Sequence, residues 1–519
     1  MKTLPRIVIT GSSGFVGRHV LDVFKEDCRI YGLARRSQAR SGAPVHPHIT
    51  WFQCDIADRA PLEAAFRKIR ESGGADFVIH LAAHYDFTGE EHPEYWRTNV
   101  EGLRNVLEVS RGLGIRRFIF SSSVAACAFP RPGAALTEMS PPDGDHIYAR
   151  TKAIGEKMLS EYRDSFPSTI VRFAALFSDW CEYPPLFMFL KTWLSNDWNR
   201  RILGGKGLSA IPYMHVREIP SFMKRLIERS DEIEPGEILI ASPDGAISHM
   251  QLFEAATRYY FGKPGRPIFM PRRLAGPGIR ARDLAGRLTG ERPFERPWMA
   301  RYIDLEMTID ASRSRRRLDW SPRARLEIIR RIPFMLENLK TDPIEWNRRN
   351  RAAMKQVWMR VNLRIYNLLE KHEQEIVEAI TRRILGPDGR SRLPSYQTET
   401  REFLQWHHRL ALRHLMNSVR TRERGVFMTY CEDLAERRFE MGFGEDELCE
   451  ALEMVGYSCI EVLGRDPEAA GLEQDLHEHI QITIRFGCDQ VLDTYEDLVA
   501  SGRRTGDRTA PPPPTSPPT

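Results

Sequence analysis

A short apolar strand that runs directly into three evenly spaced glycines is the feature that most constrains the fold of this chain. Residues 8–10 are Val-Ile-Thr, and Gly11, Gly14 and Gly17 follow at a G-x-x-G-x-x-G spacing before a helical pattern. Gly11 can turn the chain out of the strand, Gly14 lets backbone N–H groups approach a pyrophosphate, and Gly17 lets the helix pack closely on a sheet. The positive end of that helix would face the phosphates. The stretch predicts a dinucleotide phosphate site, although some such triplets are ordinary strand-turn-helix units.

The chain is too long to fold around one core. Its 519 residues, 42% of them hydrophobic, predict two domains plus tails. A net charge of +5 gives no argument for a nucleic-acid partner, and the eight cysteines show no C-x-x-C spacing, so we expect neither a disulfide framework nor a metal site. The first residues lack the apolar run of a signal peptide, and no uncharged apolar run approaches the ~18 residues of a membrane span. We therefore expect a cytoplasmic protein with no membrane span.

Four further apolar runs alternate with helical patterns along the first 120 residues. They cover residues 29–34, 50–54, 77–81 and 117–120. Strands that alternate with helices pair in parallel, because each crossover helix returns the chain to the same edge of the sheet. The pattern predicts a doubly wound parallel sheet of the α/β class.

The residues that follow these strands indicate the cofactor. The second strand ends in Arg35 and Arg36, where folds that bind NAD usually carry an acidic residue for the ribose hydroxyls, whereas a 2′-phosphate requires cationic donors. The two arginines therefore favour NADP over NAD, with a solvated basic turn as the alternative. Asp55 follows the third strand and can accept from the adenine amino group. After the fourth strand, the small side chains of Ala82 and Ala83 leave room for the nucleotide.

A tyrosine and a lysine four residues apart indicate acid–base chemistry. Tyr148 and Lys152 would lie on one helical face, where the ammonium favours the phenolate and so lowers the pKa of the phenol. Tyr148 would then be a usable general acid and base. The Y-x-x-x-K pattern is common on helices, so its weight depends on the motifs around it.

Taken together, these motifs resemble a known family. The glycine loop, Asp55, residues 80–83, Asn99, the serines at 121–123 and the pair Tyr148 and Lys152 occur in an order and spacing similar to those of the extended short-chain dehydrogenases/reductases, the NAD-dependent epimerase/dehydratase family. The similarity covers about residues 1–337. It implies a Rossmann domain with a smaller substrate-binding lobe, formed largely after Arg172.

The resemblance also implies a role for each of these residues. Tyr148 would exchange a proton with the substrate oxygen, Lys152 would also hold the nicotinamide ribose, and Ser123 would hydrogen-bond the substrate oxygen. Asn99 would hold either a proton-relay water or the geometry of its helix. The residues expected at the cofactor are Gly11, Ser13, Gly14, Phe15, Val16, Gly17, Arg35, Arg36, Asp55, Ile56, Leu81, Ala82, Ala83, Asn99, Ser121, Tyr148 and Lys152.

The chain departs from the pattern of the family members that act on nucleotide sugars. Those members usually carry Val-Tyr-Gly after the serine strand and Arg-Pro after the sixth strand, whereas this chain has Val-Ala-Ala at 124–126 and Phe173 in place of the proline. A sugar-nucleotide substrate is therefore less favoured. Aromatic residues of the lobe either line an apolar substrate cavity or belong to its core, and they are Trp180, Tyr183, Phe187 and Trp193.

The last third of the chain has the periodicity of helices. Apolar residues recur near every 3.6 positions in stretches between residues 361 and 500, with breaks near 386–389, 442–444 and 464–467. We predict an all-α bundle of four or five helices. Three stretches in it, residues 368–377, 439–442 and 448–452, are similar to the N-terminal helical sensor domain of the stressosome co-antagonist proteins over about residues 361–500. The resemblance implies sensing or dimerisation, and we expect a homodimer. The proline-rich residues 501–519 predict a disordered tail.

These expectations divide the chain into a Rossmann domain with its lobe at 1–340, a basic linker at 341–360, a helical bundle at 361–500 and the tail. We expect an NADP-dependent oxidoreductase that transfers hydride between the nicotinamide and a small-molecule carbonyl/alcohol pair. Two alternatives remain open. One is an NADP(H)-binding redox sensor whose bundle signals to a partner, and the other is an epimerase or dehydratase of a sugar nucleotide. The presence of Ser123, Tyr148 and Lys152 together favours catalysis, because a pure sensor needs no positioned acid.

Overall fold

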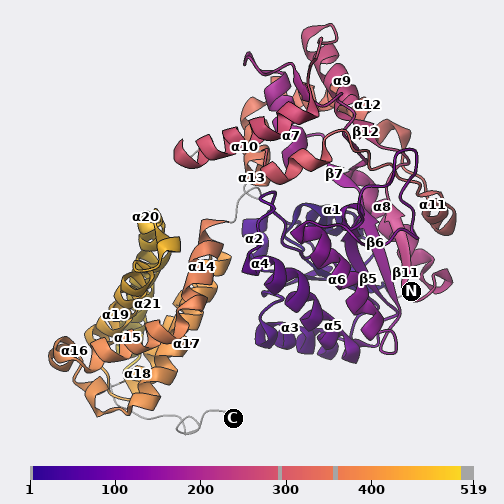
Figure 1. Ribbon diagram of the computed structural model, residues 1–519. Coiled ribbons are helices and arrows are strands. Elements are labelled where there is room, and N and C mark those ends of the chain that lie inside the picture. Colours follow the sequence, from indigo (N-terminus) through magenta and orange to yellow (C-terminus); the bar gives the residue numbers. More distant parts are fainter. Residues whose placement is uncertain (1–3, 290–294, 355–359, 504–519) are drawn as a thin grey trace. The chain divides into compact units, whose positions relative to one another are not determined.

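The computed structural model describes residues 4–289, 295–354 and 360–503 (Figure 1). Contacts along the chain form two compact units, Met1–Trp358 and Met359–Thr519, each with its own hydrophobic core. Most of the expected proline-rich tail, residues 504–519, lies outside the described residues. Within the described ranges, no helix combines the length and the apolar character needed to cross a bilayer.

A seven-stranded parallel sheet forms the centre of the first unit. Its strands lie in the order β11-β6-β5-β4-β1-β2-β3, and every neighbouring pair is parallel. The strands are β1 (Arg6–Thr10), β2 (Arg29–Ala34), β3 (Ile49–Gln53), β4 (Phe77–His80), β5 (Arg117–Ser123), β6 (Ser168–Phe173) and β11 (Glu237–Ala241). The order reverses direction between β1 and β4, which is where ligands bind in open α/β sheets. The predicted doubly wound sheet is confirmed.

Helices cover both faces of this sheet because alternate residues of each strand point to opposite sides. Ile7 and Ile9 of β1 share one core with α1 (Phe15–Phe24) and α8 (Ile219–Glu228), whereas Val8 belongs to the core under the other helices. Those other helices are α3 (Arg59–Glu71), α5 (Gly102–Ser110) and α6 (Ile147–Glu161). The strands are buried on both faces, which explains their continuous apolar runs.

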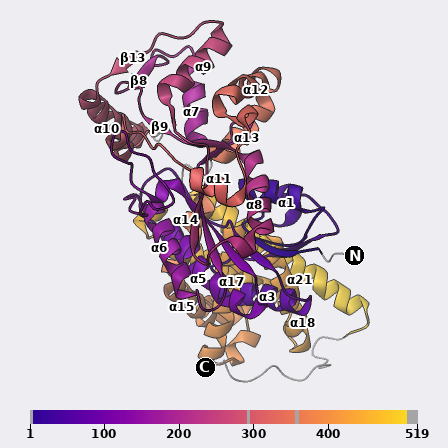
Figure 2. The ribbon, with the colours of Figure 1, turned by 90° about the vertical axis from the view of Figure 1, so that its right-hand side faces the viewer.

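A smaller lobe follows β6 and gathers at one end of the first unit (Figure 2). Its helices are α7 (Pro184–Trp193), α9 (His249–Phe261), α10 (Arg272–Thr289), α12 (Ile328–Thr341) and α13 (Pro343–Met354). Helix α11 (Ser312–Leu318) precedes α12 in the chain but packs beside β11 and α8, and its Leu318 belongs to a core of the main sheet. Its short strands are β7 (Ala175–Phe177), β8 (Ile202–Gly204), β9 (Ala210–Ile211), β10 (Tyr213–His215), β12 (Ile247–Ser248) and β13 (Ile268–Met270). Two further short helices, α2 (Gln38–Ser41) and α4 (Pro93–Trp96), follow β2 and β4. Phe187 and Trp193 are buried in the core of the lobe.

The expected basic linker differs from the structure. Residues 343–354 form α13, and its Trp346 is only 2% exposed within the core of the lobe. Asn350 is also buried, donates to the Trp180 carbonyl at 2.8 Å and accepts from the Glu182 backbone N–H at 3.0 Å. The arginines of this segment outnumber its two inward-facing side chains. Its composition is therefore similar to that of a solvent-exposed linker. The helix belongs to the first unit.

The second unit is helical, as predicted, but its described residues form eight α-helices where four or five were expected. Its helices are α14 (Val361–Lys371), α15 (Glu373–Leu385), α16 (Pro387–Arg392), α17 (Arg401–Thr421), α18 (Gly425–Glu440), α19 (Glu445–Leu463), α20 (Glu473–Leu476) and α21 (Ile482–Ala500). Residues on the predicted apolar faces, such as Ile376, Leu412, Val455 and Ile484, form one shared core. The bundle is therefore stabilised by packing of its amphipathic faces. Its likeness to a stressosome sensor domain and its dimerisation stay predictions.

Candidate functional site

The glycine loop forms a narrow cradle at the carboxyl end of β1. Gly11 has a φ of +72°, and a Cβ atom there would lie 2.7 Å from the backbone nitrogen of Ala82. A Cβ on Gly17 would clash with the carbonyl oxygen of Gly11. Helix α1 begins at Phe15, and its N-cap, Gly14, offers no side-chain acceptor to the first N–H groups. These donors are available to an anion, so the loop fits the pyrophosphate of a dinucleotide.

The two arginines after β2 lie beside this cradle. The Arg36 guanidinium donates to the Ser13 carbonyl oxygen at 2.7 Å. Arg35 lies 3.9 Å from the carboxylate of Glu94, whose side chain is fully buried. Both guanidinium groups therefore have protein partners, and the alternative of a purely solvated basic turn does not describe them.

The ends of β3 and β4 complete the edge on which a nucleotide would lie. Asp55 is buried, and its carboxylate accepts from the Ala57 backbone N–H at 3.0 Å. The side chain of Ile56 packs against Gly102. After β4, the backbone N–H of Ala82 donates to the Thr10 hydroxyl at 3.3 Å, which holds this segment against the glycine loop. The remaining predicted positions on the same edge are Leu81 and Ala83 after β4 and Val16 in the first turn of α1.

Ser123, Tyr148 and Lys152 come together between the end of β5 and α6. A hydrogen bond links the hydroxyl groups of Ser123 and Tyr148. The Lys152 ammonium donates to the Ser121 carbonyl oxygen at 2.6 Å and lies 5.7 Å from the centre of the Tyr148 ring. Ser121 in turn donates from its hydroxyl to the His80 carbonyl at 2.7 Å, so this serine ties β5 to β4.

The electrostatics of this group differ from the sequence expectation. Burial raises the pKa of Tyr148, and the hydrogen bond with Ser123 only partly offsets that rise. Burial also lowers the pKa of Lys152 to about 8, although the nearby Glu156 carboxylate acts in the opposite direction. Burial, and not the Lys152 ammonium, sets the direction of the pKa shift of the phenol. The phenol is therefore held protonated at neutral pH.

Asn99 connects the helix that carries Tyr148 to the loop after β4. It lies in a π-helical turn, Arg97–Glu101, a local irregularity that is frequent at functional sites. Its amide group donates to the His84 carbonyl at 2.9 Å and to the Thr151 hydroxyl at 3.0 Å, and it accepts from the His84 backbone N–H at 2.7 Å. Of the two roles expected for Asn99, these contacts support the one that concerns helix geometry.

The sequence analysis missed an aromatic wall in front of Tyr148. Tyr85, from the loop after β4, packs against Tyr148 with ring centres 4.3 Å apart. Phe87 lies 4.5 Å from Tyr85 and 6.1 Å from Tyr183 of the lobe. Methionines complete the surroundings of Phe87, namely Met188, Met299 and Met354. The only signal for Tyr85 in the sequence is its place just after Ala82 and Ala83, the small residues that follow the fourth strand.

Comparisons with known proteins agree with this geometry. Residues 7–241 match the model of the NAD dependent epimerase/dehydratase family. A uronate dehydrogenase of Pseudomonas putida is 28% identical over 203 residues, which are 38% of this chain and 70% of that protein. A UDP-glucose 4-epimerase of Streptococcus mutans is 29% identical over 157 residues, which are 30% of this chain and 46% of that protein.

Among solved structures, a UDP-glucose 4-epimerase of Thermotoga maritima superposes with a TM-score of 0.50 at 19% identity. This match covers 64% of the present chain and 98% of that chain. A match at this identity shows a shared fold. The family resemblance that the sequence motifs indicated is confirmed, and a nicotinamide dinucleotide fits the cradle described above. Residues 7–241 therefore form a domain that matches the NAD dependent epimerase/dehydratase family.

Proposed function

We propose that this protein is an NADP-dependent oxidoreductase that interconverts a carbonyl group and an alcohol. The observation that carries the proposal is the meeting of Ser123, Tyr148 and Lys152 beside the glycine cradle. When bound, the nicotinamide would supply or accept the hydride. The side chains of the protein would position the substrate oxygen and move the proton.

The protonation state of Tyr148 suits the direction of carbonyl reduction. Since burial raises the pKa of Tyr148, its hydroxyl holds a proton that it can donate to the substrate oxygen as that oxygen becomes an alkoxide. The Ser123 hydroxyl, already hydrogen-bonded to Tyr148, would bind the same oxygen. Lys152, with a pKa near 8, carries a positive charge at neutral pH and would hold the nicotinamide ribose.

The preference for NADP rests on Arg36 and Arg35. Arg36 contacts the Ser13 carbonyl of the glycine loop, so its guanidinium lies within the cofactor-binding edge of the sheet. A charge-assisted contact to a 2′-phosphate is worth about 1.5–3 kcal/mol, or roughly ten- to a hundredfold in affinity. Structural neighbours were solved with NAD, among them a UDP-glucose 4-epimerase of Thermus thermophilus, so the 2′-phosphate is the point on which this chain would differ.

The relatives keep a sugar-directed activity open as the second candidate. Their names, uronate dehydrogenase and UDP-glucose 4-epimerase, refer to sugar acids and sugar nucleotides. Against a sugar nucleotide stand the aromatic and methionine side chains around Phe87, which favour an apolar substrate face next to Tyr148. An NADP(H) sensor without turnover is disfavoured by the complete Ser123, Tyr148 and Lys152 group.

One substitution and one substrate panel test the proposal. NADPH oxidation would be followed with aldehydes, ketones, sterol-like ketones, uronic acids and UDP-sugars. Tyr148→Phe should abolish turnover and leave NADPH affinity within a few-fold of wild type, because the ring and its packing are retained. Full turnover of Tyr148→Phe would refute the role of the phenol. NADPH binding without oxidation across the whole panel would favour the sensor.

A further inference from the structure

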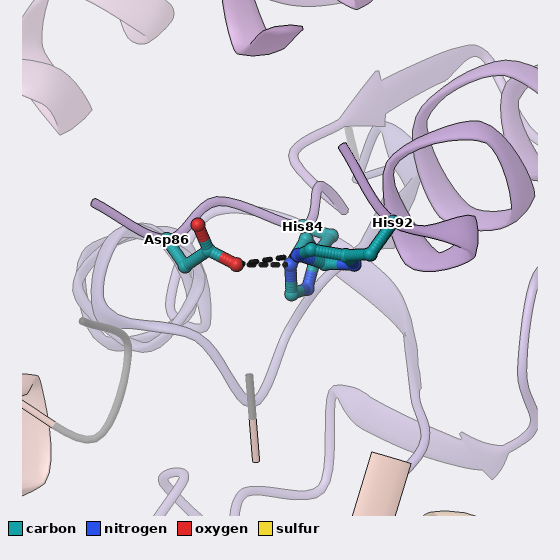
Figure 3. A group of neighbouring side chains, drawn as sticks. All are labelled: His84, Asp86 and His92. Carbon is teal, nitrogen blue, oxygen red and sulfur yellow. Dashed lines mark hydrogen bonds and ion pairs between the residues drawn. The ribbon is translucent and has the colours of Figure 1, made fainter. Parts of the chain in front are cut away.

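Two histidines and an aspartate converge at one point in the loop after β4 (Figure 3). The Nε2 atom of His92 lies 2.6 Å from Asp86 Oδ2, and the Nε2 atom of His84 lies 3.3 Å from the same oxygen. The three side chains are 10%, 1% and 10% exposed for His84, Asp86 and His92. The imidazole rings meet edge to face with centres 4.9 Å apart. Three side chains of two types that bind metals, imidazole and carboxylate, therefore face one buried point.

The surrounding contacts fix the carboxylate in place. Asp86 Oδ1 accepts from the backbone N–H and the hydroxyl of Thr88 at 3.0 and 2.7 Å, and from the Tyr95 hydroxyl at 3.1 Å. These bonds occupy one oxygen and leave Oδ2 directed at the two imidazoles. Carboxylates that bind metals are commonly held in this way by hydrogen bonds to their other oxygen. The site does not have to reorganise Asp86 to accept a cation.

The two histidines are also held in place. Asn99 binds both the N–H and the carbonyl of His84, and His92 is the N-cap residue of α4. Within the described part of the chain, Nδ1 of His92 has no hydrogen-bond partner, so it can take the proton from Nε2, and the hydrogen bond from Nε2 to Asp86 would be replaced by a bond to the metal. In the tautomer that carries its proton on Nδ1, each imidazole presents the lone pair of Nε2 to a cation.

We propose that His84, Asp86 and His92 form a three-ligand site for a first-row divalent cation of the zinc type. Zinc binds imidazole nitrogen and carboxylate oxygen at about 2.0–2.2 Å, so tetrahedral ligands lie about 3.3–3.5 Å apart. The His84–Asp86 separation of 3.3 Å already meets this value, and the 2.6 Å between His92 and Asp86 has to widen by less than about 1 Å. Mg²⁺ and Ca²⁺ prefer ligand sets made only of oxygen, and softer metal ions prefer thiolates, so two imidazoles and one carboxylate favour a cation of the zinc type.

A cation here would act on the neighbouring active site through the loop. Tyr85 lies between two of the ligands in sequence, and its ring packs on Tyr148 at 4.3 Å. Trp298 of the lobe donates to the Thr88 carbonyl at 3.0 Å, so the same loop also contacts the lobe. Bound metal would hold this loop, and with it Tyr85 and Phe87 of the aromatic wall, in one position. The inference stands independently of the proposed hydride chemistry, because it concerns binding.

The test uses the full chain after removal of metals with a chelator. Wild type should bind about one equivalent of Zn²⁺ per chain in a calorimetric titration, and Co²⁺ in its place should develop the visible absorption of a tetrahedral N/O site. Asp86→Asn and His92→Gln should each lower the affinity for Zn²⁺ by at least about tenfold. Circular dichroism checks that each variant is folded. The matched control is His46→Gln, which alters a second histidine pair whose rings, His46 and His48, also lie 4.9 Å apart.

Three results would overturn the site. They are the absence of saturable Zn²⁺ binding to wild type, wild-type affinity in a folded Asp86→Asn protein, and an equal loss of affinity in the His46→Gln control. If the variants fail to fold, the Co²⁺ spectrum of the wild type decides. A spectrum of octahedral aqueous Co²⁺ in the presence of protein refutes the proposal.

Discussion

A buried ion pair behind α6, the helix that carries Tyr148 and Lys152, gives the sharpest test of the energetics. Arg172 of β6 and Glu156 of α6 form two parallel hydrogen bonds, Nε to Oε1 at 3.0 Å and Nη2 to Oε2 at 2.7 Å. Their side chains are 1% and 4% exposed. Arg172 also donates to the Ser140 carbonyl at 2.7 Å, and the Ser122 hydroxyl donates to Glu156 at 2.5 Å. The pair therefore joins the sheet, α6 and the loop before it.

The substitution Glu156→Gln keeps the shape of the side chain and removes its charge. A buried guanidinium left without a counter-charge destabilises a protein by about 3–5 kcal/mol. With a denaturant slope of about 3 kcal/mol per molar urea for a unit of this size, the unfolding midpoint should fall by about 1–1.7 M. Every tryptophan except Trp406 lies in the first unit, so tryptophan fluorescence reports mainly on its unfolding.

Glu161→Gln on the same helix is the control. Glu161 pairs with Arg104 at 3.4 Å, and both side chains are about half exposed, so its loss should cost less than about 1 kcal/mol. Equal midpoints for the two variants would refute the reasoning that burial decides the value of the pair.

Glu156→Gln should also shift the pH dependence of NADPH binding. The Glu156 carboxylate raises the pKa of Lys152 against the larger effect of burial, which leaves that pKa at about 8. Removing the charge of Glu156 lowers the pKa of Lys152 further, so the ammonium is lost at lower pH. The alkaline limb of NADPH binding should therefore shift toward neutral pH in Glu156→Gln. An unshifted limb in a folded variant would contradict the assignment of Lys152 to the cofactor.

Three further predictions follow from individual contacts. Arg36→Ser should reduce the ratio of NADPH to NADH affinity by about ten- to a hundredfold in a fluorescence titration. Arg40→Ser is the control, and a wild type that prefers NADH would refute the NADP assignment. Trp346→Ala should destabilise the first unit by about 3–5 kcal/mol, and rapid proteolysis of wild type within α13 would contradict its place in the core. Burial lowers the pKa of His408 in the second unit to about 3, whereas the pKa of a histidine in the unfolded chain is about 6.5. Between about pH 6.5 and pH 3, only the unfolded state therefore gains a proton at this residue. Stability should therefore be complete above about pH 6.5 and fall as the pH drops toward 3, and hydrogen exchange of α17 should show a flatter dependence in His408→Gln.

Much of the architecture was predictable because it depends on local rules. The strands appeared as apolar runs, since parallel strands are buried on both faces, and the bundle appeared as 3.6-residue periodicity. The glycine loop was predictable because only glycine tolerates the backbone of Gly11 and the close approach at Gly17. The Ser123, Tyr148 and Lys152 group depended on family spacing more than on any physical pattern.

Other features escaped because they depend on contacts between distant segments. Composition made 343–354 resemble a linker, yet two inward side chains, Trp346 and Asn350, are enough to bury one face of α13. The spacing of Tyr148 and Lys152 placed both on one helical face, but the direction of the Tyr148 pKa shift was set by burial and only partly offset by the hydrogen bond with Ser123. Neither quantity is visible in a helical spacing.

The sequence by itself determined which segments are strands and helices, where the dinucleotide phosphates would lie and that the last third folds as a bundle, because each of these follows from the conformational limits and polarity of neighbouring residues. The tertiary structure alone decided what surrounds Tyr148 and what the loop after β4 can bind. His84, Asp86 and His92 are an unremarkable H-x-D-x-x-x-x-x-H in the sequence, and they become one site only when Asn99 and Tyr95 hold the loop so that both imidazoles face the same carboxylate oxygen.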